Sequence, residues 1–425
     1  MKNEFKVVSV IGLGYIGLPT AALIASKNLE VLGVDVNQKV VNTINEGKIH
    51  IVEPLLNEIV KTCVSNKKLS AAIKPKSSDV FIIAVPTPFA DNNQPDLRFV
   101  QSAFESIAPV IKSGDLIILE STSPVGTTEE MVDLISKIRP DLTFPNGLNS
   151  EPQVNVAYCP ERVLPGKIIQ ELVSNDRVIG GITTSCSERA VNFYKIFVEG
   201  ECVKTNVRTA EMCKLTENSF RDVNIAFANE LSIICDKLKI SVWELIKLAN
   251  RHPRVDILQP GAGVGGHCIA VDPWFIVSKN PEEALLIKTA RDVNDSKPYW
   301  VIDQANKSIQ SYLVANPSKT PSEISIACFG LAFKPDIDDL RESPSLEIAK
   351  HLSSLHLGEL LLVEPSVDAI PEIESKTTRL VSIKEAIDKA DIVLILVKHQ
   401  AFESIPISSW ADKIIIDACG FFQAH

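Results

Sequence analysis

No apolar run in this 425-residue chain reaches the roughly 18 residues that a membrane-spanning helix needs. The opening segment, MKNEFKVVSVIGLG, leads straight into a strand-like run and lacks the cleavage pattern of a secretory signal peptide. The net charge of −10 argues against nucleic-acid binding, although it leaves room for local basic pockets that hold phosphate. We therefore expect a cytoplasmic protein with neither a membrane nor a nucleic acid as its partner.

Cysteine pairs of the CxxC type are also missing, and the nine cysteines are an odd number scattered along the chain. This pattern argues against a disulfide framework and against a zinc cluster, so we expect no structural metal. Most of the thiols should be small, buried apolar groups.

What the chain does contain is an alternation of apolar, β-branched runs with helical stretches. Strands are predicted at KVVSVIGLG, EVLGVDVN, SDVFIIAVP, DLIILEST and VNVAYCP. Short strands separated by helices form a parallel sheet, so the first part of the chain is predicted to be an α/β domain. At ~100–200 residues per domain, the length allows two to four domains.

The middle of the chain is predicted to be helical. Residues 209–239 contain no proline or glycine, and their apolar residues recur at helical spacing. A long helix in this position could also form a dimer interface. Further helical stretches lead to the linker ANPSKTPSE at residues 315–323.

Beyond the linker, the opening pattern returns. EISIACFGLAFKP, GELLLVEPS, ADIVLILVKHQAF and DKIIIDACG repeat the order of the opening strands, and Asp35 and Glu364 each end the second strand of their copy. Convergence of two unrelated parallel sheets is the alternative explanation. The predicted fold has two Rossmann-like parallel-sheet domains, residues 1–205 and 316–425, flanking a central, mostly helical domain, residues 206–315.

A dinucleotide site is predicted at GLGYIG. Gly12, Gly14 and Gly17 follow a strand and open a helix, which is the context in which GxGxxG binds a pyrophosphate. Gly12 permits the tight turn, Gly14 lets the pyrophosphate approach, and Gly17 lets the helix pack on the strand. Asp35 would bind the ribose hydroxyls and repel a 2′-phosphate, which favours NAD over NADP.

Three threonines follow strand ends, where a doubly wound sheet binds its ligand. Thr87 stands in VPTPF, and Thr122 and Thr128 stand in ESTSPVGTT. Each hydroxyl fits a ligand contact as well as it fits a turn or a helix cap.

One cysteine is placed differently from the others. Cys268 ends the glycine-rich run GAGVGGHC, and Asp272 follows it. Because such backbone lets a ligand come close, we predict a nucleophilic thiol here. His267 is not predicted to form a dyad with it, since neighbours on an extended segment point apart. A dinucleotide site and a nucleophilic thiol together suggest an oxidation through a covalent intermediate.

Polar residues on the long helix share one face. Lys214, Asn218 and Arg221 stand at i, i+4 and i+7. This set suits an anionic, hydroxyl-rich ligand, and polarity on a half-buried helix explains it equally well.

Two more segments carry charges that suit chemistry. Glu161, in YCPERVLPGK, is framed by prolines at a strand end and is a candidate acid–base carboxylate or the partner of an arginine. Arg251, His252 and Arg254 precede the cysteine loop, and such a basic cluster suits a diphosphate.

With these motifs assembled, the chain resembles the UDP-glucose/GDP-mannose dehydrogenase family of nucleotide-sugar 6-dehydrogenases over essentially its whole length. The motifs that carry the resemblance stand in the family's order: GLGYIGLP, ESTSPVGTT, CPER, AEMCKLTENSFRDVNIAFANEL, GVGGHC and FKPDIDDLRESP. Together with IHIVEP, NRHPRVDILQPG and GVGGHCIAVDPWFIV, they imply UDP-N-acetyl-D-mannosamine as the substrate. The implied reaction is its four-electron, NAD-dependent oxidation at C6 to the carboxylate, for bacterial surface polysaccharide synthesis.

The resemblance also implies roles for residues. Cys268 matches the family's nucleophile, which captures the aldehyde as a thiohemiacetal that becomes a thioester. Lys214 matches the lysine that stabilises the oxyanion and exchanges the proton of the C6 oxygen. Asn218 and Asp272 match supporting polar residues.

Other positions match contacts to water, substrate or cofactor. Glu161 and Thr122 match residues that handle protons and water in hydrolysis. The implied substrate contacts are Arg162, Val163, Lys214, Asn218, Arg221, His252, Arg254, Gly265, Phe333 and Lys334. The implied NAD contacts, besides the glycine turn, are Tyr15, Ile16, Asp35, Thr87, Thr128 and Arg341, the last from the C-terminal domain. The segment from His252 to Arg254 is implied to reach the neighbouring subunit's site, so a homodimer is expected.

One motif departs from the family. Where a DAKG or DTRG motif is usual, this chain has DACG, with Cys419 in place of the basic residue.

UDP-N-acetylglucosamine and UDP-glucose are the alternative substrates. Two other classes stay open: a two-electron β-hydroxyacid dehydrogenase that uses Lys214 and Asn218 without Cys268, and a non-catalytic NAD or redox sensor.

Overall fold

The computed structural model describes residues 4–89, 93–146, 151–164, 166–266, 268–355, 358–370, 373 and 375–424. The chain divides into two compact units, Met1–Glu217 with Trp274–Lys279, and Asn218–Pro273 with Asn280–His425. The boundary falls inside the long helix α8 (Val207–Leu238), which the sequence predicts at 209–239. His267 lies outside the described residues.

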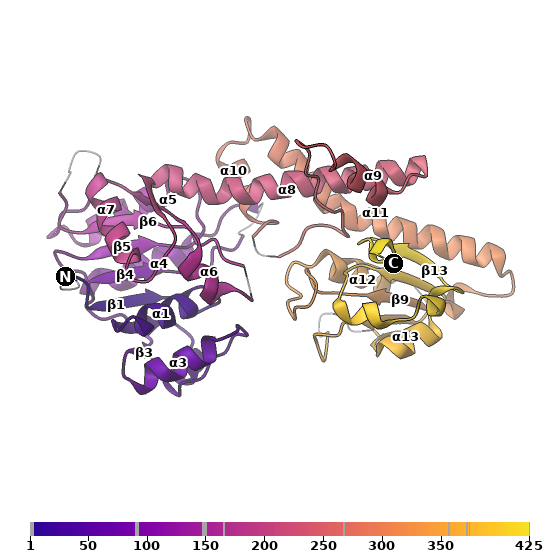
Figure 1. Cartoon of the computed structure of the whole chain (residues 1–425), viewed down its shortest axis with the longest axis horizontal. Coiled ribbons are helices and arrows are strands. Elements are labelled where there is room, and N and C mark those ends of the chain that lie inside the picture. Colours follow the sequence, from indigo (N-terminus) through magenta and orange to yellow (C-terminus); the bar gives the residue numbers. More distant parts are fainter. Residues whose placement is uncertain are drawn as a thin grey trace. The chain divides into compact units, whose positions relative to one another are not determined.

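The first unit is built on an eight-stranded sheet in the order β3-β2-β1-β4-β5-β6-β7-β8 (Figure 1). Neighbouring strands are parallel except β6 and β7. The five predicted strands are confirmed as β1, β2, β4, β5 and β6, and three more extend the sheet. The strands are β1 (Val7–Ile11), β2 (Glu30–Val34), β3 (Leu69–Ala72), β4 (Val80–Ile83), β5 (Leu116–Leu119), β6 (Asn155–Tyr158), β7 (Arg177–Gly181) and β8 (Cys202–Asn206).

Helices cover both faces of this sheet. Because alternate residues of a strand point to opposite faces, Val80 and Ile82 of β4 join one apolar cluster and Phe81 and Ile83 join the other. The first cluster takes residues from α1, α2, α3, α6 and α7, and the second from α4 and α5. These helices are α1 (Gly17–Ser26), α2 (Gln38–Asn45), α3 (Leu56–Ser65), α4 (Arg98–Ile107), α5 (Thr127–Ile138), α6 (Ile168–Ser174) and α7 (Thr184–Tyr194).

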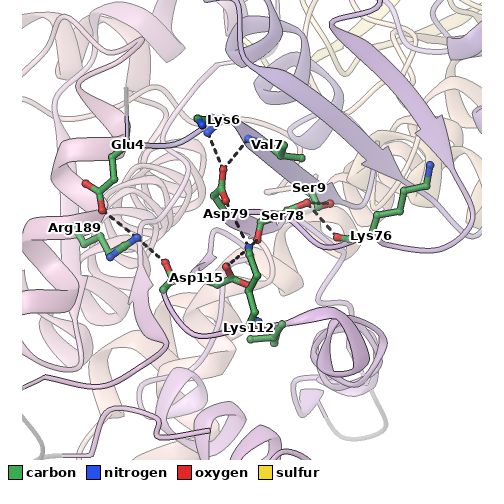
Figure 2. A network of polar contacts seen from close by, with 12 residues as sticks. Glu4, Lys6, Val7, Ser9, Lys76, Ser78, Asp79, Lys112, Asp115 and Arg189 are labelled. Atoms are coloured by element: carbon green, nitrogen blue, oxygen red, sulfur yellow. Dashed lines mark hydrogen bonds and ion pairs between the residues drawn. The ribbon is translucent and has the colours of Figure 1, made fainter. Parts of the chain in front are cut away.

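Polar contacts tie together the edge at which these strands begin (Figure 2). The Asp79 carboxylate accepts hydrogen bonds from the backbone N–H groups of Lys6 and Val7, at 2.8 and 3.0 Å. Nζ of Lys112 donates to Oδ1 of Asp115 at 2.6 Å and lies 3.6 Å from Oδ1 of Asp79. These contacts hold the starts of β1, β4 and β5 in register, and the opposite edge is the one where such sheets bind ligands.

The second unit contains a parallel sheet in the order β11-β10-β9-β12-β13, which repeats the order β3-β2-β1-β4-β5. Asp391 accepts a hydrogen bond from the N–H of Ser325 at 2.9 Å, just before β9, as Asp79 does just before β1. The predicted repeat of strand order is therefore confirmed. The strands are β9 (Ile326–Phe329), β10 (Leu360–Val363), β11 (Thr378–Leu380), β12 (Ile392–Ile395) and β13 (Ile414–Asp417).

Long helices make up the middle of the chain, as predicted. Arg291 of α11 donates to Oδ1 of Asp222 on α8 at 2.6 Å, and Asn294 donates to the same oxygen at 2.8 Å. All three side chains are buried, and a buried arginine needs such an acceptor, so the network fixes α8 against α11. The remaining helices are α9 (Val242–Ala249), α10 (Asp272–Lys279), α11 (Leu285–Ala315), α12 (Pro344–Leu355) and α13 (Ile383–Lys389). Among the described helices, none is long and apolar enough to cross a membrane.

Candidate active site

The glycine turn after β1 has the geometry that a pyrophosphate requires. Gly12 has φ +92°, and a Cβ there would lie 2.4 Å from the carbonyl oxygen of Ala84. A Cβ on Gly17 would lie 1.8 Å from the carbonyl oxygen of Gly12, so this glycine lets α1 pack on the turn. A Cβ on Gly14 would meet no atom within 4 Å, so the backbone is open to a ligand on that side. The cradle fits the dinucleotide fingerprint at each of its three glycines.

Asp35 lies at the end of β2, beside this turn. Its carboxylate accepts hydrogen bonds from the N–H groups of Leu13 and Asn37, at 3.0 and 2.9 Å, and it is half-buried. This position is the one from which an acidic residue binds the adenosine ribose of NAD. His50, which the sequence analysis did not single out, lies near Asp35, and burial lowers its pKa.

The three threonines differ in their surroundings. Thr87 and Thr122 are half-buried, whereas Thr128 is fully buried. The Thr128 hydroxyl donates to Oε1 of Glu211 at 2.6 Å, and the N–H groups of Gly126 and Thr128 donate to the same carboxylate. Glu211, which sequence reasoning missed, therefore ties the loop before α5 to the second turn of α8. The contact of Thr128 with NAD stays a prediction.

Glu161 follows β6 and lies in a buried cluster of ionisable groups. Its Oε2 accepts from Nη1 of Arg177 at 2.8 Å, and its Oε1 accepts from the N–H of Arg162 at 2.6 Å. Glu120 follows β5, and its Oε1 accepts from the hydroxyl of Tyr194 at 2.6 Å. The cluster thus places two carboxylates beside one guanidinium in the interior of the first unit.

The charge balance of this cluster affects proton binding. Burial, followed by the charge of Glu161, raises the pKa of Glu120 to about 7, against an ordinary value of 4.5. Arg177 and the Tyr194 hydroxyl oppose this rise but do not cancel it. Glu120 is therefore a carboxyl group that exchanges its proton near neutral pH, next to the predicted acid–base residue.

Arg162 and Val163 follow Glu161 in the chain. Arg162 binds Glu217 through two nitrogens, Nε at 3.1 Å and Nη2 at 2.7 Å. Val163 is half-buried against the first apolar cluster. Both remain predicted substrate contacts.

The turn after Cys268 brings several of the predicted catalytic residues together within the second unit. Nδ2 of Asn218 on α8 donates to Oδ2 of Asp272 at 2.5 Å, and both side chains are buried. The N–H groups of Val271 and Asp272 donate to the carbonyl oxygen of Cys268, at 3.1 and 2.9 Å. The exposed thiol therefore lies at the end of a turn whose other end is held by the buried Asn218–Asp272 pair. Lys214 is half-buried one helical turn before Asn218.

The glycine loop before Cys268 packs tightly against another predicted substrate segment. A Cβ on Gly266 would lie 2.8 Å from the ring of Phe333, and a Cβ on Gly265 would lie 2.3 Å from the carbonyl oxygen of Glu342. Gly263, at φ +149°, packs in the same way against Pro344. The loop therefore needs glycine at these positions because neighbouring atoms already fill the space that a Cβ would take. Tight packing, as well as access for a ligand, explains the glycine-rich sequence.

The start of this loop is fixed by residues that the sequence analysis did not single out. Oδ1 of Asn229 accepts from the N–H of Gly261 at 2.9 Å, and its Nδ2 donates to Asn294 at 2.9 Å. Both asparagines are buried. The polar network of α8 and α11 therefore extends to the cysteine loop.

The basic segment after α9 is a closed loop. Asn250 accepts from the N–H of Ile257 at 2.8 Å and donates to its carbonyl oxygen at 2.9 Å. Arg251, His252 and Arg254 stand exposed between these two residues. The reciprocal amide bonds hold the loop while its charges face solvent.

Three further predicted positions lie in the last third of the chain. Lys334 is half-buried, and the Arg341 guanidinium binds Asp339 at 2.8 and 2.6 Å. Cys419 is half-buried in the DACG turn, and burial followed by the charge of Asp417 raises the pKa of its thiol. This thiol is therefore neutral and does not replace the positive charge of the usual basic residue.

An apolar stripe runs along α8 within the second unit. Phe220, Phe227 and Ile234 recur every seven residues and are 68 %, 51 % and 43 % exposed. The sequence periodicity includes Phe220 and Phe227 in the same apolar pattern as Leu215, which is buried. The helix therefore has two apolar faces, and one of them is uncovered in the single chain.

The described residues thus fall into two groups. Gly12, Gly14, Gly17, Asp35 and the predicted NAD-binding threonines, with Glu161 and Lys214, belong to the first unit. Cys268, Asp272, Asn218, Phe333 and Lys334, with the basic loop and Arg341, belong to the second. Among the described residues, no cluster of histidine, cysteine and carboxylate side chains could hold a metal ion.

The sequence matches models of the UDP-glucose/GDP-mannose dehydrogenase family in three parts. The NAD binding domain matches residues 6–198, the central domain matches residues 208–296, and the UDP binding domain matches residues 327–424. Together these ranges account for most of the chain.

Individual relatives are similar along their full length. The UDP-N-acetyl-D-mannosamine dehydrogenase of Escherichia coli (strain K12) is 58 % identical over 420 residues, which cover 99 % of this chain and 100 % of that protein. The NDP-N-acetyl-D-galactosaminuronic acid dehydrogenase of Ralstonia nicotianae is 54 % identical, with 99 % and 97 % covered. The solved structure of the UDP-D-ManNAc dehydrogenase of Pyrococcus horikoshii is 37 % identical, with a TM-score of 0.87 over 98 % of this chain and 96 % of that one.

Proposed function

Since the chain belongs to the UDP-glucose/GDP-mannose dehydrogenase family, we propose that it oxidises UDP-N-acetyl-D-mannosamine at C6 to UDP-N-acetyl-D-mannosaminuronate. It is an NAD-dependent oxidoreductase, and its glycine turn and Asp35 fit that cofactor. The identity of 58 % with a full-length relative of that name supports this substrate. The observation that carries the chemistry is the exposed Cys268 beside the buried Asn218–Asp272 pair.

Two oxidations at one carbon need a group that holds the aldehyde between them. In the first, C6 loses a hydride, and its hydroxyl loses a proton that Lys214 takes up. The Cys268 thiolate then adds to the aldehyde carbon, and Lys214 returns the proton to the oxygen, which gives a thiohemiacetal. NAD, when bound, supplies the hydride acceptor for each oxidation.

The thiohemiacetal carbon carries a hydrogen that can leave as the second hydride. Lys214 again takes the hydroxyl proton, and the product is a thioester on Cys268. Water adds to the thioester carbonyl, Glu161 accepts the proton of this water with help from Thr122, and the C–S bond breaks. Cleavage restores the Cys268 thiolate and releases the carboxylic acid, which gives its proton to solvent, as Lys214 and Glu161 then give up theirs. The Asn218–Asp272 pair holds the turn throughout.

Product stoichiometry tests the reaction. The purified protein should release about two NADH for each molecule of UDP-N-acetyl-D-mannosamine converted, because four electrons leave C6. A panel with UDP-N-acetylglucosamine, UDP-N-acetylgalactosamine and UDP-glucose would rank the substrates. One NADH per sugar, with free aldehyde as the final product, would sink the proposal.

A cysteine substitution separates the enzyme classes. Cys268→Ser should abolish acid formation while NAD affinity stays unchanged, whereas Cys202→Ser, on the edge strand β8, should keep full activity. A two-electron β-hydroxyacid dehydrogenase has no need of Cys268, so undiminished turnover in Cys268→Ser would support that class instead.

We also propose a homodimer that pairs through α8. The stripe of Phe220, Phe227 and Ile234 is the kind of uncovered apolar surface that marks a protein interface. Phe227→Asp should convert the dimer to a monomer in light scattering, whereas Leu248→Asp, at another exposed apolar residue, should leave the mass unchanged. A dimer that persists in Phe227→Asp would place the interface elsewhere.

Mixed dimers test whether the basic loop serves the neighbouring subunit. Arg254→Ala and Cys268→Ser should each be inactive alone. If the loop acts across the interface, a scrambled mixture forms sites that combine Cys268 of one chain with Arg254 of the other. Such a mixture should recover about one quarter of the unsubstituted activity, and no recovery would assign the loop to its own chain.

The domain division at 1–205, 206–315 and 316–425 is proposed with the same roles: NAD binding, dimerisation with the catalytic helix, and UDP-sugar binding. The product is a UDP-linked uronic acid, which we expect to serve bacterial surface polysaccharide synthesis. The cytoplasm is the expected compartment.

A further inference from the structure

The two sheets place corresponding residues beyond corresponding strands. Glu364 directly follows β10, as Asp35 directly follows β2. His399 stands four residues beyond the end of β12, as Thr87 stands four residues beyond the end of β4. The pair Glu364 and His399 therefore stands where the first sheet has its predicted NAD contacts.

In the second sheet, these two residues face one another. Nε2 of His399 lies 3.1 Å from Oε2 of Glu364, and the two side chains are 1 % and 4 % exposed. Oε2 also accepts from the N–H groups of Leu331 and Ala332, at 2.7 and 2.9 Å. The half-buried Asp35 also accepts from two backbone N–H groups, those of Leu13 and Asn37, and neither of these hydrogen bonds comes from a ring. His399 thus lies against the carboxylate that corresponds to Asp35, the predicted ribose-binding residue of the first sheet.

The second ring nitrogen of His399 binds the backbone of Asp336, at the other end of segment 331–336. Nδ1 accepts from the N–H of Asp336 at 3.0 Å, and Oδ1 of Asp336 accepts from the N–H of Gln400 at 2.9 Å. Asp336 has φ +59°, a conformation that a non-glycine residue keeps only when its surroundings hold it. Since Nδ1 accepts, the neutral ring carries its proton on Nε2, the nitrogen that lies 3.1 Å from Oε2 of Glu364.

The charge on Glu364 suits this arrangement. Burial acts to raise its pKa, but His399 and the N–H groups of Leu331 and Ala332 act more strongly, so the pKa is lowered overall. The carboxylate therefore stays ionised at neutral pH. Its ionised oxygens hold one end of the segment 331–336, and His399 connects that end to the other.

The segment between these two points carries predicted substrate contacts. Phe333 and Lys334 lie inside it, and the Phe333 ring packs against Gly266, two residues before Cys268. The segment also falls in the range matched by the UDP binding domain. A displacement of Asp336 or Ala332 would therefore move both the nucleotide contacts and the wall of the cysteine loop.

We propose that His399 and Glu364 are positioning residues that hold segment 331–336 in the conformation that binds the UDP group of the substrate, an inference that rests on the proposed function. The pair stands at the positions of the second sheet that correspond to Asp35 and Thr87 of the first, and it braces the segment from there. His399 acts through the backbone of residues 331–336.

Calorimetric titration with UDP and with NAD tests this role in the full-length protein. His399→Ala should raise the Kd for UDP about 10-fold, the effect of losing one buried hydrogen bond that orders a binding segment, and leave the Kd for NAD within about 2-fold. His399→Asn should recover part of the UDP affinity, because its Oδ1 can accept the Asp336 N–H. His351→Ala, at a histidine of α12 whose ring packs on Tyr299, is the matched control and should leave both constants unchanged.

Steady-state kinetics give a second readout. In His399→Ala, the KM for the UDP-sugar should rise by a similar factor while kcat at saturation stays within about 3-fold, since the chemical groups are untouched. Should His399→Ala fail to fold, His399→Asn and Glu364→Gln carry the same comparison.

The UDP and NAD dissociation constants together decide whether His399 positions the UDP-binding segment. A Kd for UDP that is unchanged in folded His399→Ala, or a parallel loss of UDP and NAD affinity, would overturn the inference, as would an unsubstituted protein that does not bind UDP. If the unsubstituted protein binds UDP in a His399-dependent way but oxidises no UDP-sugar, the inference stands and the proposed function fails.

Discussion

Asn218 of α8 and Asp272 of α10 share a buried hydrogen bond of 2.5 Å, although 54 residues separate them in the chain. The bond joins the long helix to the turn that carries Cys268, whose carbonyl oxygen accepts from the N–H of Asp272. Asn218 and Asp272, which match the family's supporting polar residues, therefore position the backbone of Cys268.

This pairing predicts different results for two substitutions of Asp272. Asp272→Asn keeps an oxygen that can accept from Asn218 but removes the negative charge, so the fold should be retained and kcat should fall about 100-fold. Asp272→Ala removes the acceptor as well and should also lower the thermal midpoint. Measuring kcat and unfolding side by side separates charge from positioning, and equal activity in Asp272→Asn and the unsubstituted protein would remove the charge from the mechanism.

The glycine turn predicts a contrast between two neighbouring positions. Gly14→Ala should fold normally because its Cβ meets open space, yet it should weaken NAD binding about 10-fold by occupying the approach of the pyrophosphate. Gly17→Ala should lower the thermal midpoint because its Cβ overlaps the carbonyl oxygen of Gly12. Fluorescence titration with NAD and a melting curve for each variant test this contrast. Unchanged NAD affinity in Gly14→Ala would speak against a pyrophosphate at this turn.

Glu120 predicts a pH dependence of stability. Its pKa in the folded protein, about 7, is above the ordinary 4.5, so the folded state binds the proton more tightly than the unfolded chain. The stabilising effect is complete below pH 4.5 and is lost as the pH rises through 7. Glu120→Gln is neutral throughout and can still accept from Tyr194, so it should gain up to about 3 kcal/mol relative to the unsubstituted protein between pH 5 and pH 8.

Thermal midpoints at several pH values between 5 and 8 measure this gain. Glu188→Gln, at an exposed glutamate paired with Lys204, should show no pH-dependent difference. A constant difference between Glu120→Gln and the unsubstituted protein would mean that Glu120 does not titrate in this range.

The Glu211 carboxylate predicts a purely structural effect. Three donors, the N–H groups of Gly126 and Thr128 and the Thr128 hydroxyl, lose their buried acceptor in Glu211→Ala. The first unit should be destabilised by about 2–3 kcal/mol. Glu188→Ala serves as the exposed control in the same denaturation series, and equal stability of the two variants would contradict the assignment.

The sequence predicts the fold well where the pattern is local. Apolar, β-branched composition is enough to predict β1, β2, β4, β5 and β6. The GxGxxG motif is enough to predict the cofactor turn. The edge strand β8, CVKTN, is missed because it is polar and largely exposed, so its pairing with β7 decides its conformation. Helix α8 is predicted, but its second apolar face is not separated from the first.

The site is predicted less completely, because burial depends on tertiary contacts. Charged residues are usually exposed, so nothing in the sequence singles out Glu120 or Arg177, yet both are buried beside Glu161. Asn229 looks like an ordinary helical residue until the N–H of Gly261 is seen to need its oxygen. Spacing on one helix, as with Lys214 and Asn218, is visible in the sequence, and a contact across 54 residues is not.

Of the nine cysteines, Cys268 alone is exposed, and the other eight are buried or half-buried. Because Cys268 is the most accessible thiol, a mild alkylating reagent applied to the native protein should react with it before it reacts with any other cysteine. The extent of labelling then counts the accessible Cys268 thiols in a preparation, without a substrate.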